Sequence, residues 1–305
     1  MNYTINQLRI FVKVCEYQSV TKAAEAMFLT QPAISIQLKK LQDEFDVALT
    51  EVIGRRIFIT DFGREVEKLA KDILDKLERM QGAANDYKGL LTGQLKIASA
   101  STGKYVIPYF LTGFMRKYPG VSISIDVTNK TRVVESLQAN TIDFAMVSVI
   151  PPNIPLEKVP LLKNELNLVA AAKFPKLPKR MTHKKLSEQT LIFREKGSAT
   201  RETMTNYLSQ HQIEAKQTMY LVSNEAVKQA VQAGLGLSIL PLIGIQKELL
   251  LETMRIIPIK GLPIFSEWNL VYGKGKQLLP AGKALIHYLN EHKQRIITDH
   301  FGNVS

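Results

Sequence analysis

The sequence is poor in cysteine, histidine and tryptophan. Cys15 is the one cysteine among 305 residues, which also include five histidines and one tryptophan. A single thiol cannot close a disulfide within the chain, so a disulfide-stapled scaffold is excluded and a reducing compartment is expected. The histidines show no metal-ligand spacing, so we expect no bound metal and no cofactor.

A long apolar run is also missing. The most apolar window, residues 234–246, is short and contains Pro241, so we expect no membrane-spanning helix. The first residues become polar too early for a secretory signal peptide, which predicts a cytoplasmic protein. An apolar content of 45% is ordinary for a globular chain, and 305 residues correspond to roughly two domains of about 150 residues.

The first part of the chain has no excess charge. Residues 1–91 contain 13 basic and 13 acidic residues, so residues 92–305 hold the whole net charge of +12. A positive charge of this size suggests nucleic-acid binding. Because the excess lies in the C-terminal two-thirds, with ten basic against three acidic residues over 163–201, DNA binding has to be argued from particular residues.

The first sixty residues carry the pattern of a helix-turn-helix. A first helix has apolar residues at helical spacing, and a second follows a capping Ser19 or Thr21. Thr30 is a typical N-cap for a third helix, with Pro32 in the first turn, where its missing N–H costs least. A tight two-residue connection joins the second and third helices. The positions expected to face the core are Leu8, Phe11, Val12, Cys15, Ala23, Ala24, Met27, Ile34, Leu38, Leu41 and Phe45.

The other face of the third helix is polar. It offers an amide, a hydroxyl and an ammonium group within reach of base edges and phosphates. An ordinary solvated helix face is the alternative, but the turn before the helix and the strands after it favour DNA contact. The candidate DNA-binding residues of this helix are Thr30, Gln31, Pro32, Ser35, Ile36 and Lys39.

Two short apolar stretches, residues 49–52 and 57–59, follow the third helix. Gly54, Arg55 and Arg56 lie between them. Two strands around a glycine turn predict a wing, and its paired arginines are the further candidates for DNA contact, along phosphates.

A long helix is predicted after the wing. Thr60 can cap it, and its apolar residues step by three and four over about 28 residues, which is long for a globular helix. Such a seam between charged flanks predicts a coiled-coil-like dimer helix, with packing against its own domain as the alternative. The seam consists of Phe62, Val66, Leu69, Ile73, Leu77, Met80 and Ala84.

Beyond a helix-breaking segment at Gly89–Gly93, strands alternate with helices. This order predicts a parallel sheet covered by helices, and two α/β lobes with a cleft between them. Strands are predicted at 94–99, 121–127, 142–148, 166–172, 190–194, 218–222, 236–240 and 268–272. Helices are predicted at 103–117, 131–138, 199–211, 224–233, 242–250 and 281–296.

In sheets of this kind, ligands lie beyond the carboxyl ends of the strands, at the starts of the following helices. Unpaired helical N–H groups suit anions, and an arginine at a strand end can pair with a carboxylate or phosphate at two points. We therefore predict a binding site for a small anionic ligand. The candidate residues are Ser101, Thr102, Thr131, Ser148, Arg194, Ser198 and Thr200.

Each of these candidates also has a purely structural explanation. Ser101, Thr131 and Ser198 can be N-caps only. Arg194 can form a structural salt bridge with Glu195 or with another residue of its lobe.

In combination, these features resemble the LysR-type transcriptional regulators, over nearly the whole chain. Residues 193–201 and 223–231 are most similar to the subgroup associated with RuBisCO-operon control. The matching positions are Leu8, Phe11, Val14, Ser19, Ala23, Ala24, Thr30–Ala33, Ser35, Leu38, Leu41, Ile59, Thr60, Gly63, Leu95–Ile97, Tyr118–Val121 and Gly234–Gly236.

The resemblance implies a homo-oligomer, usually a dimer of dimers, that binds an interrupted palindrome in double-stranded DNA with its third helix in the major groove. It implies that a small effector in the C-terminal cleft changes DNA bending and the recruitment of RNA polymerase. In the family, the positions of Ser101, Thr102 and Thr131 commonly line the effector pocket.

Four positions depart from the family pattern. Thr50 and Val52 replace the usual Phe and Arg, and Gln42 and Asp46 replace the usual Glu and Gly. The missing wing arginine removes one expected phosphate contact, whereas Arg55 matches the next family arginine.

Two rival functions fit the sequence less well. An enzyme can share an α/β fold, but no nucleophile–base constellation stands out, and Gly234-Leu235-Gly236 has no phosphate-loop lysine. A secreted solute-binding protein would need a signal peptide and would have no helix-turn-helix.

The sequence therefore predicts an N-terminal all-α winged helix-turn-helix (residues 1–59) and a linker and dimerisation helix with a hinge (60–91). A C-terminal α/β two-lobed effector domain of the periplasmic-binding-protein type II follows (92–305). Lobe I is expected to comprise 92–162 and 268–305, and lobe II 163–267. The predicted protein is a cytoplasmic DNA-binding transcriptional regulator, not an enzyme, controlled by a small anionic metabolite.

Overall fold

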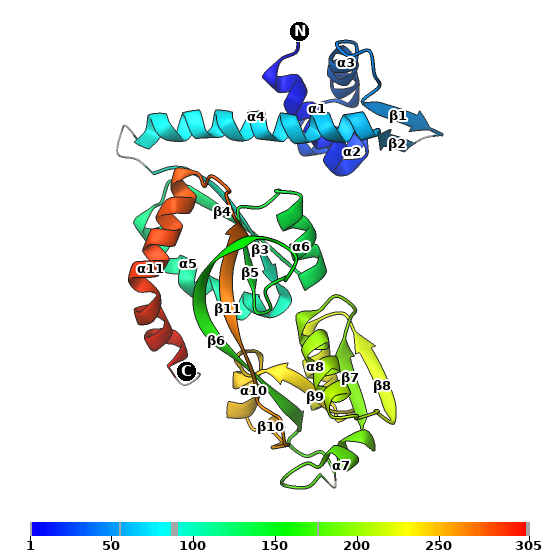
Figure 1. The fold of residues 1–305 in the computed structure, drawn as a ribbon, viewed down its shortest axis with the longest axis vertical. Coiled ribbons are helices and arrows are strands. Elements are labelled where there is room, and N and C mark those ends of the chain that lie inside the picture. Colours follow the sequence, from blue (N-terminus) through cyan, green and yellow to red (C-terminus); the bar gives the residue numbers. More distant parts are fainter. Residues whose placement is uncertain (1, 55, 87–90, 176, 303–305) are drawn as a thin grey trace. The chain divides into compact units, whose positions relative to one another are not determined.

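A computed structural model of the chain describes residues 2–54, 56–86, 91–175 and 177–302. It divides into two compact units, residues 1–89 and 90–305, which are described separately (Figure 1). In the described ranges, none of the helices is both long enough and apolar enough to cross a membrane.

The first unit is the predicted winged helix-turn-helix. Its first two helices begin at side-chain caps: Thr4 forms a capping box with Gln7, and the Ser19 hydroxyl accepts from the Lys22 N–H at 3.3 Å. Ser19, and not Thr21, therefore caps the second helix. The elements are α1 (Ile5–Tyr17), α2 (Val20–Ala26), α3 (Gln31–Gln42), β1 (Thr50–Ile53), β2 (Arg56–Ile59) and α4 (Asp61–Asp86).

The apolar stripes of the first three helices meet in one core. Ile34 and Leu41 of α3 are fully buried with Phe11 of α1 and Ala23 of α2. Phe45 packs at the edge of this core from a position beyond the end of α3. The core holds α3 from behind and leaves its other face free.

The wing and the start of α4 are held by local hydrogen bonds. β1 and β2 pair antiparallel, and Gly54 takes the left-handed conformation (φ +64°) that the turn between them requires. The Thr60 hydroxyl accepts from the Gly63 N–H at 2.9 Å and donates to the Ala48 carbonyl at 2.6 Å. Thr60 thus caps α4 as predicted and ties it to the chain before the wing.

The apolar seam of α4 has two different environments. Val66 is buried and Phe62 partly buried in the unit's own core, together with Ala70, which lies outside the predicted seam. Farther along the helix, Leu69, Ile73 and Met80 are exposed. Packing against its own domain therefore accounts for the first turns only. The side chain of Ala84 lies outside the described residues.

In the second unit, the described strands include a seven-stranded sheet that runs through both lobes. β3 is parallel to β4 and β5, as predicted, but β11 is antiparallel to both β5 and β6. The sheet is therefore mixed and not parallel. The reason is that β6 leaves the first lobe and β11 returns to it. The strand order is β10-β6-β11-β5-β3-β4, with β9 also paired to β6.

Helices cover both faces of the first lobe (Figure 1). On one face, Phe110 and Phe114 of α5 and Leu285 of α11 share a core with the sheet; on the other, Val133 of α6 packs against Ala98. The elements are β3 (Gly93–Ala100), a 3-10 turn η1 (Ser101–Tyr105), α5 (Ile107–Lys117), β4 (Val121–Thr128), α6 (Lys130–Gln138), β5 (Phe144–Val147), β6 (Leu156–Ala171), β11 (Ile264–Gly273) and α11 (Pro280–Phe301).

The second lobe places helices on both sides of β7. Phe193 of β7 packs with Leu208 of α8, whereas its neighbour Ile192 packs with Val227 of α9, as the alternation of a strand requires. The elements are α7 (His183–Ser187), β7 (Thr190–Arg194), α8 (Ala199–Gln210), β8 (Gln217–Leu221), α9 (Asn224–Gln232), β9 (Ser238–Pro241), η2 (Leu242–Gly244), α10 (Gln246–Leu250) and β10 (Met254–Ile256).

Two predicted strands and two predicted helices differ from the structure. The strands expected at 166–172 and 268–272 are only parts of the longer β6 and β11, because charged residues and Pro160 interrupt the apolar pattern. The expected lobe boundaries at 162/163 and 267/268 thus fall inside strands.

The helices expected at 103–117 and 242–250 are each divided into a 3-10 turn and a shorter helix. In the first of these, a Cβ on Gly103 would lie 2.2 Å from the Ser99 hydroxyl, so only glycine allows this close turn.

Candidate DNA-binding and effector sites

The polar face of α3 is presented to solvent. Gln31 and Lys39 are exposed and Ser35 is half-buried, and the Gln31 amide donates to the Ser35 hydroxyl at 2.9 Å. Thr30, Pro32 and Ile36 are exposed beside them. Thr30 is the N-cap residue, although its side chain makes no capping hydrogen bond with the described residues. The structure thus brings all six predicted residues of this helix onto one accessible surface.

Of the two wing arginines, Arg56 is exposed at the start of β2, and Arg55 lies outside the described residues.

The departure from the family at Gln42 has a structural role that the sequence did not reveal. Its amide accepts from the Leu49 N–H at 2.5 Å and donates to the Val47 carbonyl at 3.2 Å. A carboxylate cannot donate to that carbonyl, so glutamine fixes the chain between α3 and the wing at both points.

The predicted effector residues lie at strand ends and helix starts of the second unit. Four of them are buried: Thr102, Arg194, Ser198 and Thr200. Two are half-buried, Ser101 and Ser148, and one is exposed, Thr131. The α6 and α8 starts come together: the Thr131 N–H donates to the Gly197 carbonyl at 3.3 Å, and Lys130 pairs with Glu202 at 2.6 Å. Among the described residues, no hydrogen bond or ion pair joins Ser148 to this group.

The capping alternative is wrong for Ser101 and Thr131, because Ala100 and Asn129 hold the N-cap positions of η1 and α6. Asn129 caps α6 and Ser223 caps α9, each through a side-chain oxygen that accepts a backbone N–H at 3.1 Å. Ser198 stands at the N-cap position of α8 but makes no such bond within the described chain. A capping role thus accounts for Asn129 and Ser223, whereas it does not account for the hydroxyl of Ser198.

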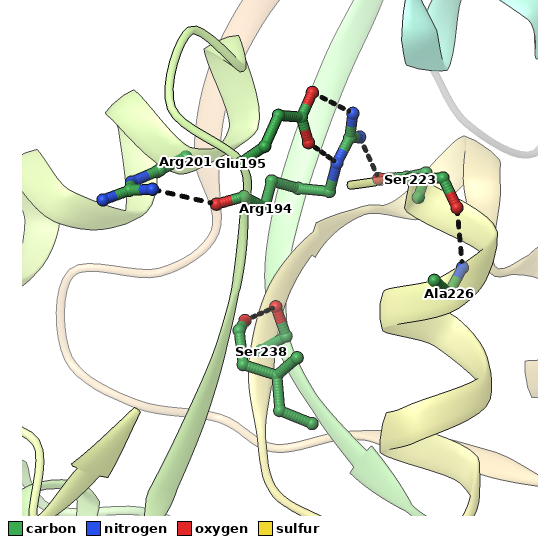
Figure 2. Close-up of polar contacts among 8 residues, drawn as sticks. Arg194, Glu195, Arg201, Ser223, Ala226 and Ser238 are labelled. Carbon is green, nitrogen blue, oxygen red and sulfur yellow. Dashed lines mark hydrogen bonds and ion pairs between the residues drawn. The ribbon is translucent and has the colours of Figure 1, made fainter. Parts of the chain in front are cut away.

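Arg194 already has a carboxylate partner in this structure. Figure 2 shows its guanidinium meeting Glu195 at two points, with Nε 2.8 Å and Nη2 2.9 Å from the two carboxylate oxygens. Its Nη1 donates to the Asn224 side-chain oxygen at 3.1 Å. The salt bridge with Glu195 that the sequence left open as an alternative is therefore present.

A second group of charges lies between the lobes, which sequence reasoning missed. The Tyr105 hydroxyl of η1 donates to the Glu225 carboxylate at the start of α9. Lys104 and Lys228 lie 3.4 Å and 3.0 Å from the same carboxylate, and Lys228 also pairs with Glu248 at 2.7 Å. The sequence did offer one signal: Glu225 and Lys228 are three residues apart on a predicted helix, which is the spacing of an ion pair.

These contacts shift proton affinities. Burial raises the pKa of Tyr105 well above its ordinary value, and its hydrogen bond to Glu225 adds to the effect. For Glu225, partial burial acts to raise the pKa, but hydrogen bonds from Tyr105 and Lys228 and the positive charges of Lys228 and Lys104 outweigh burial and lower the pKa. Tyr105 therefore stays protonated as a donor while Glu225 stays ionised as the acceptor.

Comparison with known proteins agrees with this architecture. The family model described as LysR substrate binding domain matches residues 88–294. The model described as bacterial regulatory helix-turn-helix protein, lysR family, matches residues 5–64.

Similar proteins match over nearly their full length. The chain is 36% identical over 299 residues to the RuBisCO operon transcriptional regulator of Allochromatium vinosum, covering 97% of this chain and 98% of the relative. It is 35% identical over 296 residues to the HTH-type transcriptional activator CmpR of Synechocystis sp., covering 97% of each.

A solved structure extends the comparison. The regulatory domain of Synechocystis PCC6803 CcmR in complex with 2-PG matches with a TM-score of 0.63 and 33% identity, covering 67% of this chain and 98% of that one. With the winged helix-turn-helix, the two-lobed α/β unit and both family models in agreement, the chain belongs to the LysR family of transcriptional regulators, and its relatives include regulators of RuBisCO operons.

Proposed function

We propose that this LysR-family regulator binds a specific DNA sequence through α3 and the wing, and that a small anionic metabolite bound between its lobes controls it. The observation that carries the DNA-binding part is the contrast between the two faces of α3. Ile34 and Leu41 are fully buried, whereas Gln31 and Lys39 are exposed. A helix fixed from behind can place side chains in the major groove without a cost for ordering.

The exposed residues of this surface divide by chemistry. We assign Gln31 and Ser35 to base edges, because amides and hydroxyls read the donor and acceptor pattern of the major groove. Thr30, Pro32 and Ile36 flank them and suit contacts with sugar and thymine methyl groups. We assign the cations Lys39, Arg55 and Arg56 to phosphates, which fix register and carry little sequence information.

The proposed effector is a carboxylate or a phosphate. Support comes from the similar CcmR regulatory domain, whose ligand 2-phosphoglycolate carries both groups. Arg194 supplies the buried positive charge. The other residues proposed to bind the effector supply hydroxyl and N–H donors, and they lie in η1, α6 and α8 and at the end of β5. They are Ser101, Thr102, Thr131, Ser148, Ser198 and Thr200.

We further propose that the protein self-associates through α4. Leu69, Ile73 and Met80 are apolar and exposed on one helix, which suits a second copy of the same helix. A dimer, and in the family's manner a tetramer, would then meet an interrupted palindrome in the cytoplasm and act on RNA polymerase. In this scheme residues 1–59 bind DNA, 60–91 connect and dimerise, and 92–305 bind the effector.

Control requires that the effector bind one lobe arrangement better than another, since a ligand with equal affinity for both shifts nothing. The Thr131–Gly197 and Lys130–Glu202 contacts join the two lobes at the helix starts that carry candidate ligands. A ligand placed there therefore has different contacts whenever the lobes move.

The test measures DNA and effector binding in one preparation. Full-length protein is titrated onto a labelled fragment of its own upstream region at increasing salt, with 2-phosphoglycolate present or absent. We expect salt-sensitive, sequence-specific retention that the ligand changes, and a raised melting temperature with the ligand. Retention that is absent at every salt concentration would refute the DNA-binding part, and stabilisation by neutral or cationic compounds alone would refute the anionic effector.

A further inference from the structure

The guanidinium of Arg194 is one of the most deeply placed charges of the second unit. The residue is 3% exposed, at the carboxyl end of β7. A buried cation is costly unless a carboxylate neutralises it, and an arginine satisfies its geometry best with two parallel hydrogen bonds. Glu195 supplies both bonds in this structure (Figure 2).

The position of Glu195 is different from that of a fixed structural partner. Neighbouring residues of a strand point to opposite faces, so a side chain can fold back onto the preceding one only where the strand has ended. β7 ends at Arg194, and Glu195 begins the turn that leads through Gly197 (φ +89°) to α8. Its side chain is 20% exposed, against 2% for that of Arg194. The carboxylate therefore has a path to water, whereas the guanidinium does not.

Polar groups that lack well-aligned partners surround the same pair. The Asn224 side-chain oxygen accepts from Arg194, and its buried Nδ2 lies towards the Tyr105 hydroxyl without forming a well-aligned hydrogen bond among the described residues. The Ser198 hydroxyl, three residues after Glu195 and 6% exposed, makes no capping bond with that part of the chain. A buried amide donor without a well-aligned acceptor costs free energy, which a ligand bringing its own oxygens would recover.

We propose that Glu195 is an internal substitute for the effector: it occupies the Arg194 guanidinium while the site is empty, and the anionic effector binds by displacing it. This inference rests on the proposed effector site and adds how that site is kept neutral and selective. When displaced, Glu195 turns outward to water, and Arg194 exchanges one two-point carboxylate contact for another.

Such an exchange makes the site selective for charge. A monocarboxylate offers Arg194 only what Glu195 already offers, so its net gain is small. A molecule with a second anionic group gains further contacts from the donors of Ser198, Asn224 and the α8 start, and so overcomes the competition. Glu195 would thereby exclude abundant simple carboxylates and admit a ligand such as 2-phosphoglycolate.

The experiment compares full-length wild-type protein with Glu195→Gln by calorimetric titration with 2-phosphoglycolate and with glycolate. Glutamine keeps the shape of the side chain and removes its charge. Glu214→Gln is the matched control, because Glu214 is exposed in the same lobe beyond the far end of α8, about 18 Å along the helix. Thermal unfolding without ligand shows whether each variant is folded.

We expect Glu195→Gln to bind 2-phosphoglycolate about tenfold more tightly than wild type, because a charge-assisted competitor becomes a neutral one. Glycolate should gain by a larger factor, so that selectivity narrows, while Glu214→Gln behaves as wild type. If the folded variant binds 2-phosphoglycolate equally or more weakly while wild type binds it, Glu195 only positions Arg194 and the substitution idea fails, but the effector site stands. If neither protein binds any anion, the proposed effector function fails as well.

Discussion

The two regions that we propose bind DNA and the effector hold their charged residues in opposite ways. In the first unit, Lys39 and Arg56 are exposed on a segment that has no net charge, whereas the strongly basic stretch 163–201 keeps Arg194 buried against Glu195. An exposed cation gains little from a partner in water and stays available to a phosphate, but a buried one has to be neutralised. Burial and pairing, more than the number of charges, therefore indicate what each region can bind.

The largest effect should come from the apolar support of α3. Leu41→Ala removes a fully buried side chain beneath the proposed DNA-binding surface and should cost about 2–5 kcal/mol of unfolding free energy, through lost burial and the cavity left behind. Urea denaturation followed by circular dichroism measures it. Lys39→Ala on the exposed face is the control and should change stability by no more than about 0.5 kcal/mol. Equal losses in the two variants would contradict the division of α3 into a supporting face and a free face.

The next effect concerns DNA and separates the two chemical roles on that free face. Gln31→Ala should weaken binding to the specific site by about 1–3 kcal/mol while leaving non-specific binding nearly unchanged, since base-edge contacts carry the sequence information. Lys39→Ala should weaken both equally and reduce the salt slope by about one unit. Anisotropy titrations on specific and scrambled duplexes decide between them, and a uniform loss for both variants would remove the distinction.

The smallest effect should come from Glu225, the half-exposed carboxylate that contacts Tyr105 and Lys104 of the other lobe. Because the pKa of Glu225 is lowered in the folded protein, its ionic contribution to stability is present above its ordinary pKa of 4.5 and is lost as the pH falls through the lower folded value. Wild type should therefore exceed Glu225→Gln in stability at pH 7, by less than about 1 kcal/mol because the carboxylate is nearly half exposed. The difference should shrink towards zero as the pH falls from 4.5 through the lower folded pKa. A difference that persists unchanged in acid would show that charge is not its source.

Local rules were sufficient for the first unit. Helical spacing, a cap at Ser19 or Thr21 and a glycine turn at Gly54 predict the elements close to their observed bounds, because α1 to α3 and the wing depend on neighbours along the chain. The hydrogen bonds of Gln42 to the chain before β1 were not predictable, since they depend on the exact path of a loop.

In the second unit, local rules predicted most strands and helices, but not the direction in which the strands pair or the contacts between distant elements. The direction of β11 relative to β5 depends on a partner more than a hundred residues away. The Tyr105–Glu225 contact has the same origin, because it joins residues 120 apart in sequence. Arg194 and Glu195 could be identified as a possible pair, but only the end of β7 at that position turns the two side chains towards each other.

β6 and β11 both run from one lobe of the second unit to the other, and they pair with each other. Their pairing limits how the two lobes can move. The two strands are bonded in register from Ile264 and Leu166 to Gly273 and Leu156, with a bulge between Trp268 and Asn269. A ladder of this kind resists sliding, because sliding breaks its hydrogen bonds together, but it bends and twists at a bulge. If an effector controls the protein as proposed, we therefore expect the two lobes to rotate about the bulge at Asn269 and not to slide along the two strands.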